Sequence, residues 1–151
     1  MTILLAVIIT ILSSYNLRNT GIRSAIHKAE AISESVKSGL TSHMINNNMN
    51  QASTFINSIS SMKNVEKLWL VRGELVNKQY GLGKYNGKPL DSMDNTVLKT
   101  GKMQYKLDET ITKTSMRITI PYNASSEKNI DCLQCHTVKL GDTLGAISLV
   151  L

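Results

Sequence analysis

The residues of this chain that could do chemistry stand together near its C-terminal end, in Cys132-Leu133-Gln134-Cys135-His136. Two cysteines separated by two residues and followed directly by histidine are the pattern through which c-type haem is attached to a polypeptide. Within one turn of chain each thiol can add across a vinyl group of the porphyrin, and the adjacent imidazole then lies under the iron. The sequence therefore predicts one covalently attached haem c per chain, with Cys132 and Cys135 as thioether anchors and His136 as the proximal iron ligand.

Two other kinds of site use similar residues. The chain has two cysteines, both in this motif, so no disulfide framework competes for them. A thioredoxin-like dithiol shares the cysteine spacing, but it belongs at the end of a strand that opens a helix in a βαβ unit, and we predict no such unit here. A zinc site needs further ligands, and the other histidines, His27 and His43, lie far upstream. We therefore favour haem, with the dithiol and the zinc site as alternatives.

Length and charge exclude several other classes of protein. A chain of 151 residues holds one domain with a modest core. Its formal net charge is +6, but the basic residues are scattered and aromatic residues make up only 5% of the chain, so we expect no nucleic-acid partner. The sequence contains no evident carboxylate pair, nucleophile elbow or phosphate loop, and we therefore expect that the protein is not an enzyme.

The first residues of the chain predict a membrane segment. Residues 1–12 are apolar apart from Thr2 and Thr10. A spanning helix needs about twenty apolar residues, and a signal peptide begins with basic ones. We therefore expect residues 1–14 to be a partial transmembrane segment, with a buried core helix as the alternative. The haem motif favours the membrane, because c-type attachment takes place outside the cytoplasm after export.

The other end of the chain leads to a matching expectation. Residues 145–151 form an apolar run without a polar tail, as though a second membrane segment followed. The sequence therefore predicts that residues 15–151 are an extracytoplasmic domain and a fragment of a larger membrane receptor.

A helical period covers the first part of this domain. Apolar residues recur at three- and four-residue steps from about residue 17 to residue 62, which predicts one long amphipathic helix with a kink or break allowed at Asn46-Asn47-Asn48. We expect its upper half to pack on another helix, in a dimer or from a later segment of the same chain.

A strand-like period follows the helix and makes the predicted fold α+β. Asp91 or Ser92 is expected to cap a short helix that Gly101 ends, and the haem motif is expected in the loop between Tyr122 and Gly141. The predicted strands cover residues 67–72, 102–108, 115–121 and 143–151, with a further one starting at 74–76.

Several other segments match one known type of domain. They are Gly39-Leu40-Thr41-Ser42-His43-Met44, Leu68-Trp69-Leu70-Val71-Arg72, Lys106-Leu107-Asp108-Glu109, Arg117-Ile118-Thr119-Ile120-Pro121 and Gly141-Asp142-Thr143-Leu144-Gly145-Ala146-Ile147-Ser148. With the haem motif, they resemble the periplasmic haem c sensor domains of bacterial methyl-accepting chemotaxis receptors and related membrane signalling proteins. The resemblance implies a long N-terminal helix followed by a PAS-like antiparallel sheet, with the haem-binding loop before the last strand. It also implies a homodimer, a bacterial inner-membrane location with the sensor domain in the periplasm, and an output module elsewhere in the receptor.

The second axial position of the iron decides what such a domain does. A strong second ligand makes an electron carrier, whereas a weak or absent one admits a small diatomic gas or a redox-dependent change. We predict Met44 as the distal ligand, because it lies on the apolar stripe of the long helix and in the segment that resembles the family. His43 is a weaker candidate, since it points about a hundred degrees away around the helix.

The predicted function is therefore an extracytoplasmic haem c sensor domain that detects redox state or a small diatomic ligand through a change in distal ligation. The first alternative is a membrane-anchored c-type cytochrome for electron transfer. A second alternative is a haem-free sensor that binds a small solute and uses the two cysteines as a thiol switch.

Overall fold

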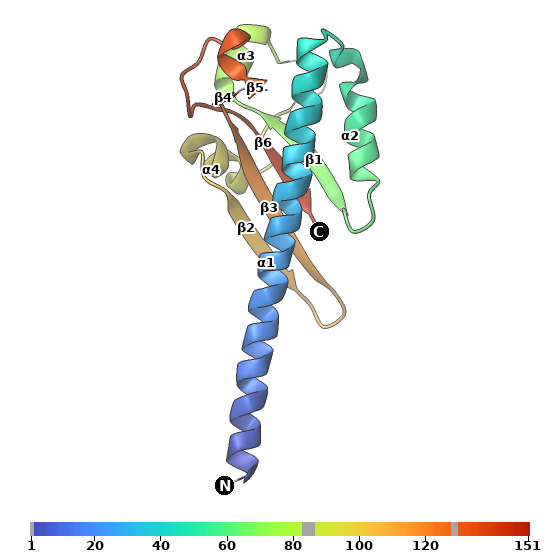
Figure 1. Cartoon of the computed structure of the whole chain (residues 1–151), viewed down its shortest axis with the longest axis vertical. Helices are drawn as coiled ribbons and strands as arrows, with labels where there is room; N and C mark the ends of the chain where they lie inside the picture. The colour runs from blue at the N-terminus through green and yellow to red at the C-terminus, as the bar shows by residue number, and fades with distance from the viewer. Residues whose placement is uncertain (1, 83–86, 128–129) are drawn as a thin grey trace.

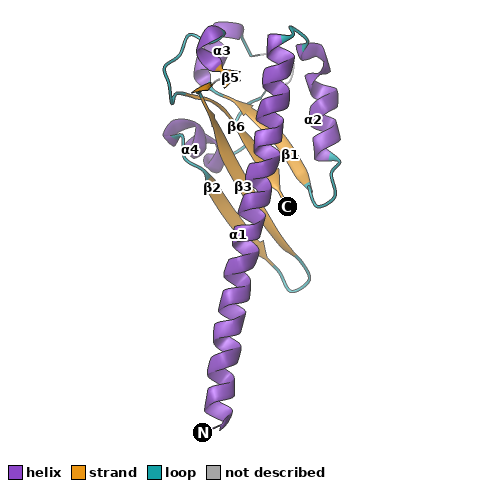
Figure 2. Cartoon of the chain, viewed as in Figure 1, coloured by secondary structure: helices purple, strands orange, loops and turns teal. Residues whose placement is uncertain are grey.

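The structure is a computed structural model that describes residues 2–82, 87–127 and 130–151 (Figure 1). Within these residues a four-stranded antiparallel sheet is flanked by helices (Figure 2), which confirms the predicted α+β class, with a long N-terminal helix and the motif loop before the last strand. The elements, in chain order, are α1 (Thr2–Ile45), the 3-10 turn η1 (Met49–Gln51), α2 (Ala52–Ser60), β1 (Lys67–Arg72), α3 (Glu74–Tyr80), α4 (Ser92–Thr100), β2 (Gln104–Glu109), β3 (Thr114–Asn123), β4 (Ser126–Glu127), β5 (Ile130–Asp131), the 3-10 turn η2 (Cys132–Gln134) and β6 (Thr143–Val150).

Helix α1 has two parts with different surroundings. Residues 2–18 are all exposed, and Figure 1 shows this part projecting beyond the sheet. The N-terminal part is long and apolar enough to cross a membrane, and none of that apolar window is buried within the chain. Residues 2–14 therefore do not form a buried core helix here, while Met1 lies outside the described residues. Membrane anchors and signal sequences share this length and composition.

The helix predicted from residue 17 to residue 62 is broken at the asparagine run, where a kink or break was allowed, but the reversal of the chain at this point was not predicted. Helix α1 ends at Ile45, and Asn47 has a φ of 50°, a left-handed conformation that asparagine tolerates better than most residues. Helix α2 then returns alongside the end of α1 (Figure 1). A Cβ atom at Gly39 would lie 2.2 Å from the Phe55 ring, so this glycine lets α2 approach. The upper half of α1 thus packs on a later segment of the same chain.

The sheet is antiparallel throughout, with strand order β1-β6-β3-β2. Alternate residues of each strand face opposite sides, so β6 places Ile147 and Leu149 on one face and Ala146 and Ser148 on the other. Helix α1 covers the first face and builds the main core with it. Its buried members are Ala29, Ile32, Val36, Leu40, Ala52, Val65, Met116, Ile118, Ile120, Ile147 and Leu149.

Helix α4 covers the other face and is fixed there by a buried carboxylate. Asp94 is fully buried, and its Oδ1 accepts hydrogen bonds from Ser148 Oγ at 2.7 Å and from Arg117 Nη2 at 2.8 Å. The indole of Trp69 donates to its Oδ2 at 3.1 Å. We call Asp94 and these three partners the Asp94 network. It ties α4 to strands β1, β3 and β6, because each partner comes from a different strand.

The helix expected before Gly101 is confirmed. Asp91 caps α4 by accepting hydrogen bonds from the backbone N–H groups of Met93 and Asp94, and Gly101 ends it with a φ of 63°. The strands expected over 67–72, 102–108, 115–121 and 143–151 are also confirmed, with small differences at their ends.

The strand expected at 74–76 is wrong, because these residues begin helix α3. Gly73 is extended at its N-cap position, and Glu74 forms an i,i+4 ion pair with Lys78 at 2.7 Å. Both features favour a helix start. Val76 packs inward from α3, whereas Leu75 is 37% exposed, so the apolar residues that resemble a strand occupy different sides of a helix.

Candidate functional site

The cysteine-histidine motif forms a tight turn at one end of the sheet. Residues 132–134 are the 3-10 turn η2, and the Asp131 carboxylate caps it by accepting a hydrogen bond from the Leu133 N–H at 3.1 Å. The backbone N–H of His136 donates to the Cys132 carbonyl at 2.9 Å, and that of Cys135 donates to the same carbonyl at 3.3 Å. The turn therefore gathers both thiols and the imidazole of the predicted haem-binding residues into one turn of chain.

The two cysteines have different surroundings. Cys132 is buried and packs in a small apolar group with Ala124, Leu144 and three partly buried neighbours, whereas Cys135 is exposed. We call this group the motif cluster; the neighbours are Val76, Tyr122 and Val138. The motif is thus anchored through Cys132, and the second thiol faces outward.

His136 is half-buried and has a buried ring nitrogen that needs a partner. Its Nδ1 atom has no hydrogen-bond partner among the described residues. Burial lowers the pKa of the imidazole below its usual value, and the positive charge of Arg72 lowers it further. The ring is therefore neutral at pH 7, which is the form that binds a metal. Leaving a buried polar atom unpaired costs about 1–3 kcal/mol, so this nitrogen favours binding of a ligand or a hydrogen-bonding group.

Helix α3 holds the motif in place from the side. The amide of Gln79 donates from Nε2 to the Cys135 carbonyl at 2.9 Å and accepts at Oε1 from the Thr137 N–H at 2.9 Å. The Tyr80 hydroxyl also donates to the Cys135 carbonyl. Its ring meets the His136 ring edge-on, with centroids 5.3 Å apart and planes at 85°. These contacts were not predicted, because nothing in the local pattern at 74–80 indicates a partner some 55 residues later.

The residues present fit a haem c group. Two thiols and a neutral imidazole are the groups that covalent haem attachment requires, and the buried Nδ1 atom of the imidazole has no hydrogen-bond partner among the described residues. A porphyrin also needs apolar side chains over its faces. The motif loop and α3 expose four large ones: Leu75, Tyr80, Leu133 and Leu140.

The two predicted distal ligands lie near the end of α1. Met44 is partly buried and packs against the main core, while the His43 ring lies against Phe55 of α2 with centroids 5.8 Å apart. Among the described residues, no hydrogen bond, ion pair or ring contact joins either side chain to His136. Distal ligation by Met44 or His43 therefore stays a prediction.

A link between α1 and the motif cluster was missed by the sequence analysis. Thr41 Oγ1 and the Tyr122 hydroxyl share a hydrogen bond of 2.7 Å, and the Lys37 ammonium lies 5.8 Å from the Tyr122 ring centroid. Burial raises the pKa of Tyr122. Because 3.6 residues make one helical turn, Met44 lies about 60° around α1 from Thr41, whereas His43 lies on almost the opposite side. Of the two candidates, Met44 is the one nearer the face of α1 that meets the motif cluster.

The structure also bears on the zinc and dithiol alternatives. Among the described residues, no group of three or more His, Cys, Asp and Glu side chains is placed to hold a metal ion. The motif follows the short strand β5 as a 3-10 turn beside an antiparallel sheet, rather than opening a helix in a βαβ unit. Neither alternative gains support from these elements.

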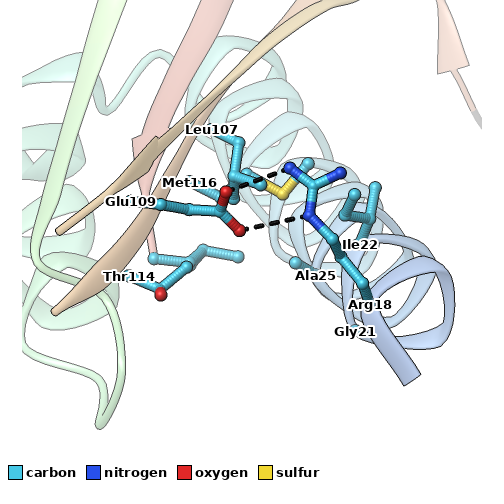
Figure 3. Close-up of a pocket in the computed structure, with 9 residues that line it drawn as sticks. Arg18, Gly21, Ile22, Ala25, Leu107, Glu109, Thr114 and Met116 are labelled. Atoms are coloured by element: carbon cyan, nitrogen blue, oxygen red, sulfur yellow. Dashed lines mark hydrogen bonds and ion pairs between the residues drawn. The ribbon is translucent and has the colours of Figure 1, made fainter. Parts of the chain in front are cut away.

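A separate cavity of about 310 Å³ lies lower on the molecule, between α1 and the β2–β3 hairpin (Figure 3). Its floor is apolar, and Arg18 and Glu109 form an ion pair at 3.0 Å at its edge. Met116, near the opposite end of β3 from Tyr122, also lines it, so this cavity is distinct from the motif.

Comparison with known proteins adds no relative to this description. The chain matches no protein-family model and no curated protein sequence.

Proposed function

We propose that this chain is the extracytoplasmic haem c sensor domain of a membrane signalling receptor, which detects redox state or a small diatomic gas. The observation that carries the proposal is the tight turn of residues 132–136, in which one buried thiol, one exposed thiol and a neutral imidazole with an unpaired buried nitrogen come together. Covalently attached haem supplies an iron whose charge and axial ligands can change. Cys132 and Cys135 would hold the porphyrin, and His136 would be the proximal ligand.

The arrangement of elements supports sensing over simple electron transfer. Tyr122, which packs with Cys132 in the motif cluster, shares a hydrogen bond with Thr41 of α1, and the motif precedes β6, one of the two inner strands of the sheet. A movement at the motif would therefore act on two elements at once. Shifting a two-state output from 1:99 to 99:1 requires only about 5.5 kcal/mol of differential binding, which a change of axial ligand can provide.

The PAS-like resemblance and the membrane location belong to the same proposal. The antiparallel sheet, with helices on both faces and the motif before the last strand, agrees with the resemblance, whereas small electron-carrier cytochromes are all-helical. The exposed apolar part of α1 would anchor the domain in the bacterial inner membrane, with the sheet in the periplasm. A homodimer is part of the same proposal, because the resemblance implies one.

The test is to mature the full chain in a host with haem c assembly machinery and to record its mass and absorption spectra. We expect a mass increase of one haem per chain that survives denaturation, and a spectrum that changes on reduction and on addition of CO or NO. Replacement of both Cys132 and Cys135 by alanine should abolish the covalent haem, while Ser125→Ala serves as a control in the same loop. Colourless protein with the mass of the bare chain contradicts the proposal.

The same spectra separate the sensor from an electron-transfer cytochrome. Met44→Ala should alter the spectrum of the reduced protein if Met44 is the distal ligand, and His43→Ala should leave it unchanged. A spectrum that does not respond to CO, NO or either substitution favours a carrier with another strong distal ligand.

A further inference from the structure

Helix α3 makes hydrogen bonds to the motif that covalent attachment of haem does not require. Gln79 bonds to the peptide groups on both sides of His136, since its amide donates to the Cys135 carbonyl at 2.9 Å and accepts from the Thr137 N–H at 2.9 Å. A side-chain amide used in this way restrains the backbone on each side of a single residue. The conformation of His136 is therefore controlled by a helix that lies outside the motif.

Tyr80 adds a restraint on the imidazole itself. Its hydroxyl is the second donor to the Cys135 carbonyl, and the Gln79 amide also donates to this hydroxyl at 3.1 Å. Its ring lies edge-on to His136 at 85°, with 5.3 Å between centroids. An edge-to-face contact of this kind restricts rotation of both rings. One side chain thus holds the backbone and the other holds the ring.

Both residues are exposed, so their contacts contribute little to the core. Tyr80 is 51% exposed, and Gln79 is also at the surface. Exposed hydrogen bonds add little to folding stability. The geometry of these contacts is therefore better explained by their effect on the orientation of His136 than by a contribution to the stability of the fold.

We propose that Gln79 and Tyr80 are positioning residues that orient the His136 imidazole and so set its alignment with the iron. This inference rests on the proposed function, because it concerns how the haem ligand is held. Outer partners of a metal-binding histidine control its orientation and basicity, and their loss changes metal binding or electronic properties. Gln79 and Tyr80 would act on this ligand through its backbone and its ring edge.

The test uses the full chain in detergent, both without haem and after haem maturation. Without haem, Gln79→Ala should make the Thr137 amide exchange with solvent about threefold to tenfold faster, the factor that one hydrogen bond of ordinary net strength implies. Gln79→Glu keeps the acceptor for Thr137 but loses the donor to Cys135, so it should retain protection of the Thr137 amide. Tyr80→Phe keeps the ring contact, whereas Tyr80→Ala loses it.

With haem attached, the readout is the low-temperature electron paramagnetic resonance spectrum of the ferric iron, which depends on the orientation of the axial imidazole. Gln79→Ala and Tyr80→Ala should shift or broaden this spectrum, and Tyr80→Phe should restore most of the wild-type signal. Lys78→Ala is the matched control, because Lys78 lies on the same helix and pairs with Glu74. All variants should unfold at nearly the same urea concentration.

The outcomes separate this inference from the proposed function. Wild-type haem and exchange behaviour in Gln79→Ala and Tyr80→Ala would overturn the positioning role while leaving the sensor proposal intact. Failure of the wild-type chain to acquire haem would overturn the sensor proposal and, with it, the role at the iron. Faster Thr137 exchange in Gln79→Ala would then show only that Gln79 orders the loop.

Discussion

Two short helices, α3 and α4, pack near the inner strand β6, and different kinds of contact hold them there. In the α4 corner a fully buried carboxylate, Asp94, accepts hydrogen bonds from side chains on three strands. In the α3 corner the polar contacts are exposed and go from Gln79 and Tyr80 to the backbone of the motif. Helix α4 is therefore held by a buried side chain that bonds to the sheet, and helix α3 is held by exposed side chains that bond to the backbone of the motif.

The unpaired polar atoms sharpen this difference. Both carboxylate oxygens of Asp94 are paired, although Nε of Arg117 in the same corner is buried without a partner. In the α3 corner two buried atoms lack partners among the described residues, Oδ1 of Asn77 and Nδ1 of His136. Polar networks in folded proteins are usually satisfied, and departures concentrate at functional sites. The comparison therefore indicates that the α4 corner mainly stabilises the fold, and it supports the proposal that the α3 corner binds a ligand.

The largest expected effect is loss of the buried carboxylate. Asp94→Ala leaves the Arg117 guanidinium, whose side chain is 17% exposed, without its buried partner and removes the acceptor of Trp69 and Ser148. Breaking a buried charged pair from one side costs about 3–5 kcal/mol. Urea denaturation should show a loss of this size, whereas Gln79→Ala in the α3 corner should change the unfolding free energy by less than about 1 kcal/mol. Equal losses of unfolding free energy in Asp94→Ala and Gln79→Ala would show that the two corners contribute alike to stability.

The end of α4 provides the second test. Gly101 ends the helix with a φ of 63°, and a Cβ atom there would lie 3.0 Å from Thr143 Oγ1. A left-handed conformation costs a residue with a Cβ atom about 1–2 kcal/mol, so Gly101→Ala should lower the unfolding free energy by that amount. Gly101→Asn should cost less, because asparagine tolerates this conformation better. Thermal or urea unfolding of both variants measures the two losses of unfolding free energy. A Gly101→Ala variant as stable as the wild type would contradict the prediction.

The two corners also differ in how far the sequence predicted them. Helix α4 was predicted with its end at Gly101 and with Asp91 or Ser92 as its cap, because these signals act within a few residues of chain, and the structure has Asp91 as the cap. The haem c assignment of Cys132, Cys135 and His136 also depends only on local spacing, and it stays a prediction. The strands followed from their alternation, which depends only on neighbouring residues.

What was missed depends on contacts between distant segments. Residues 74–76 resemble a strand, and only the helix-start features at Gly73 and Glu74 and the side-chain pair with Lys78 distinguish a helix. A break of the long helix at the asparagine run was allowed, but its reversal there depends on α2 packing back on α1 at Gly39, which periodicity does not show. The contacts that define the site, such as Thr41 with Tyr122, join positions 81 residues apart and follow only from the assembled fold.

The link between α1 and the motif cluster is the third test, and its effect should be near 1 kcal/mol. Thr41→Val keeps the shape of the side chain but leaves the part-buried Tyr122 hydroxyl without its partner, which costs about 1 kcal/mol. Tyr122→Phe removes the hydroxyl, and the double variant should lose less than the sum of the two single losses. Additive losses in a double-mutant cycle would show that the two hydroxyls do not interact. In that case the motif would not be coupled to α1 by this contact.

The smallest effect concerns acid stability in the α4 corner. Hydrogen bonding from Arg117 lowers the pKa of Asp91 below its ordinary value in the folded chain, and the N–H groups it caps lower it further. A group whose pKa is lowered by folding binds fewer protons in the folded state, so its contribution is complete above the unfolded pKa and is lost as pH falls through the folded one. Because the Asp91 side chain is 42% exposed, we expect less than about 1 kcal/mol. Urea denaturation from pH 7 downwards should therefore show that the free energy of unfolding begins to fall at about pH 5. This fall should be shallower in Asp91→Asn, which keeps a capping oxygen but has no charge to lose. Superimposable pH profiles would mean that the negative charge at Asp91 adds nothing to the stability of this corner.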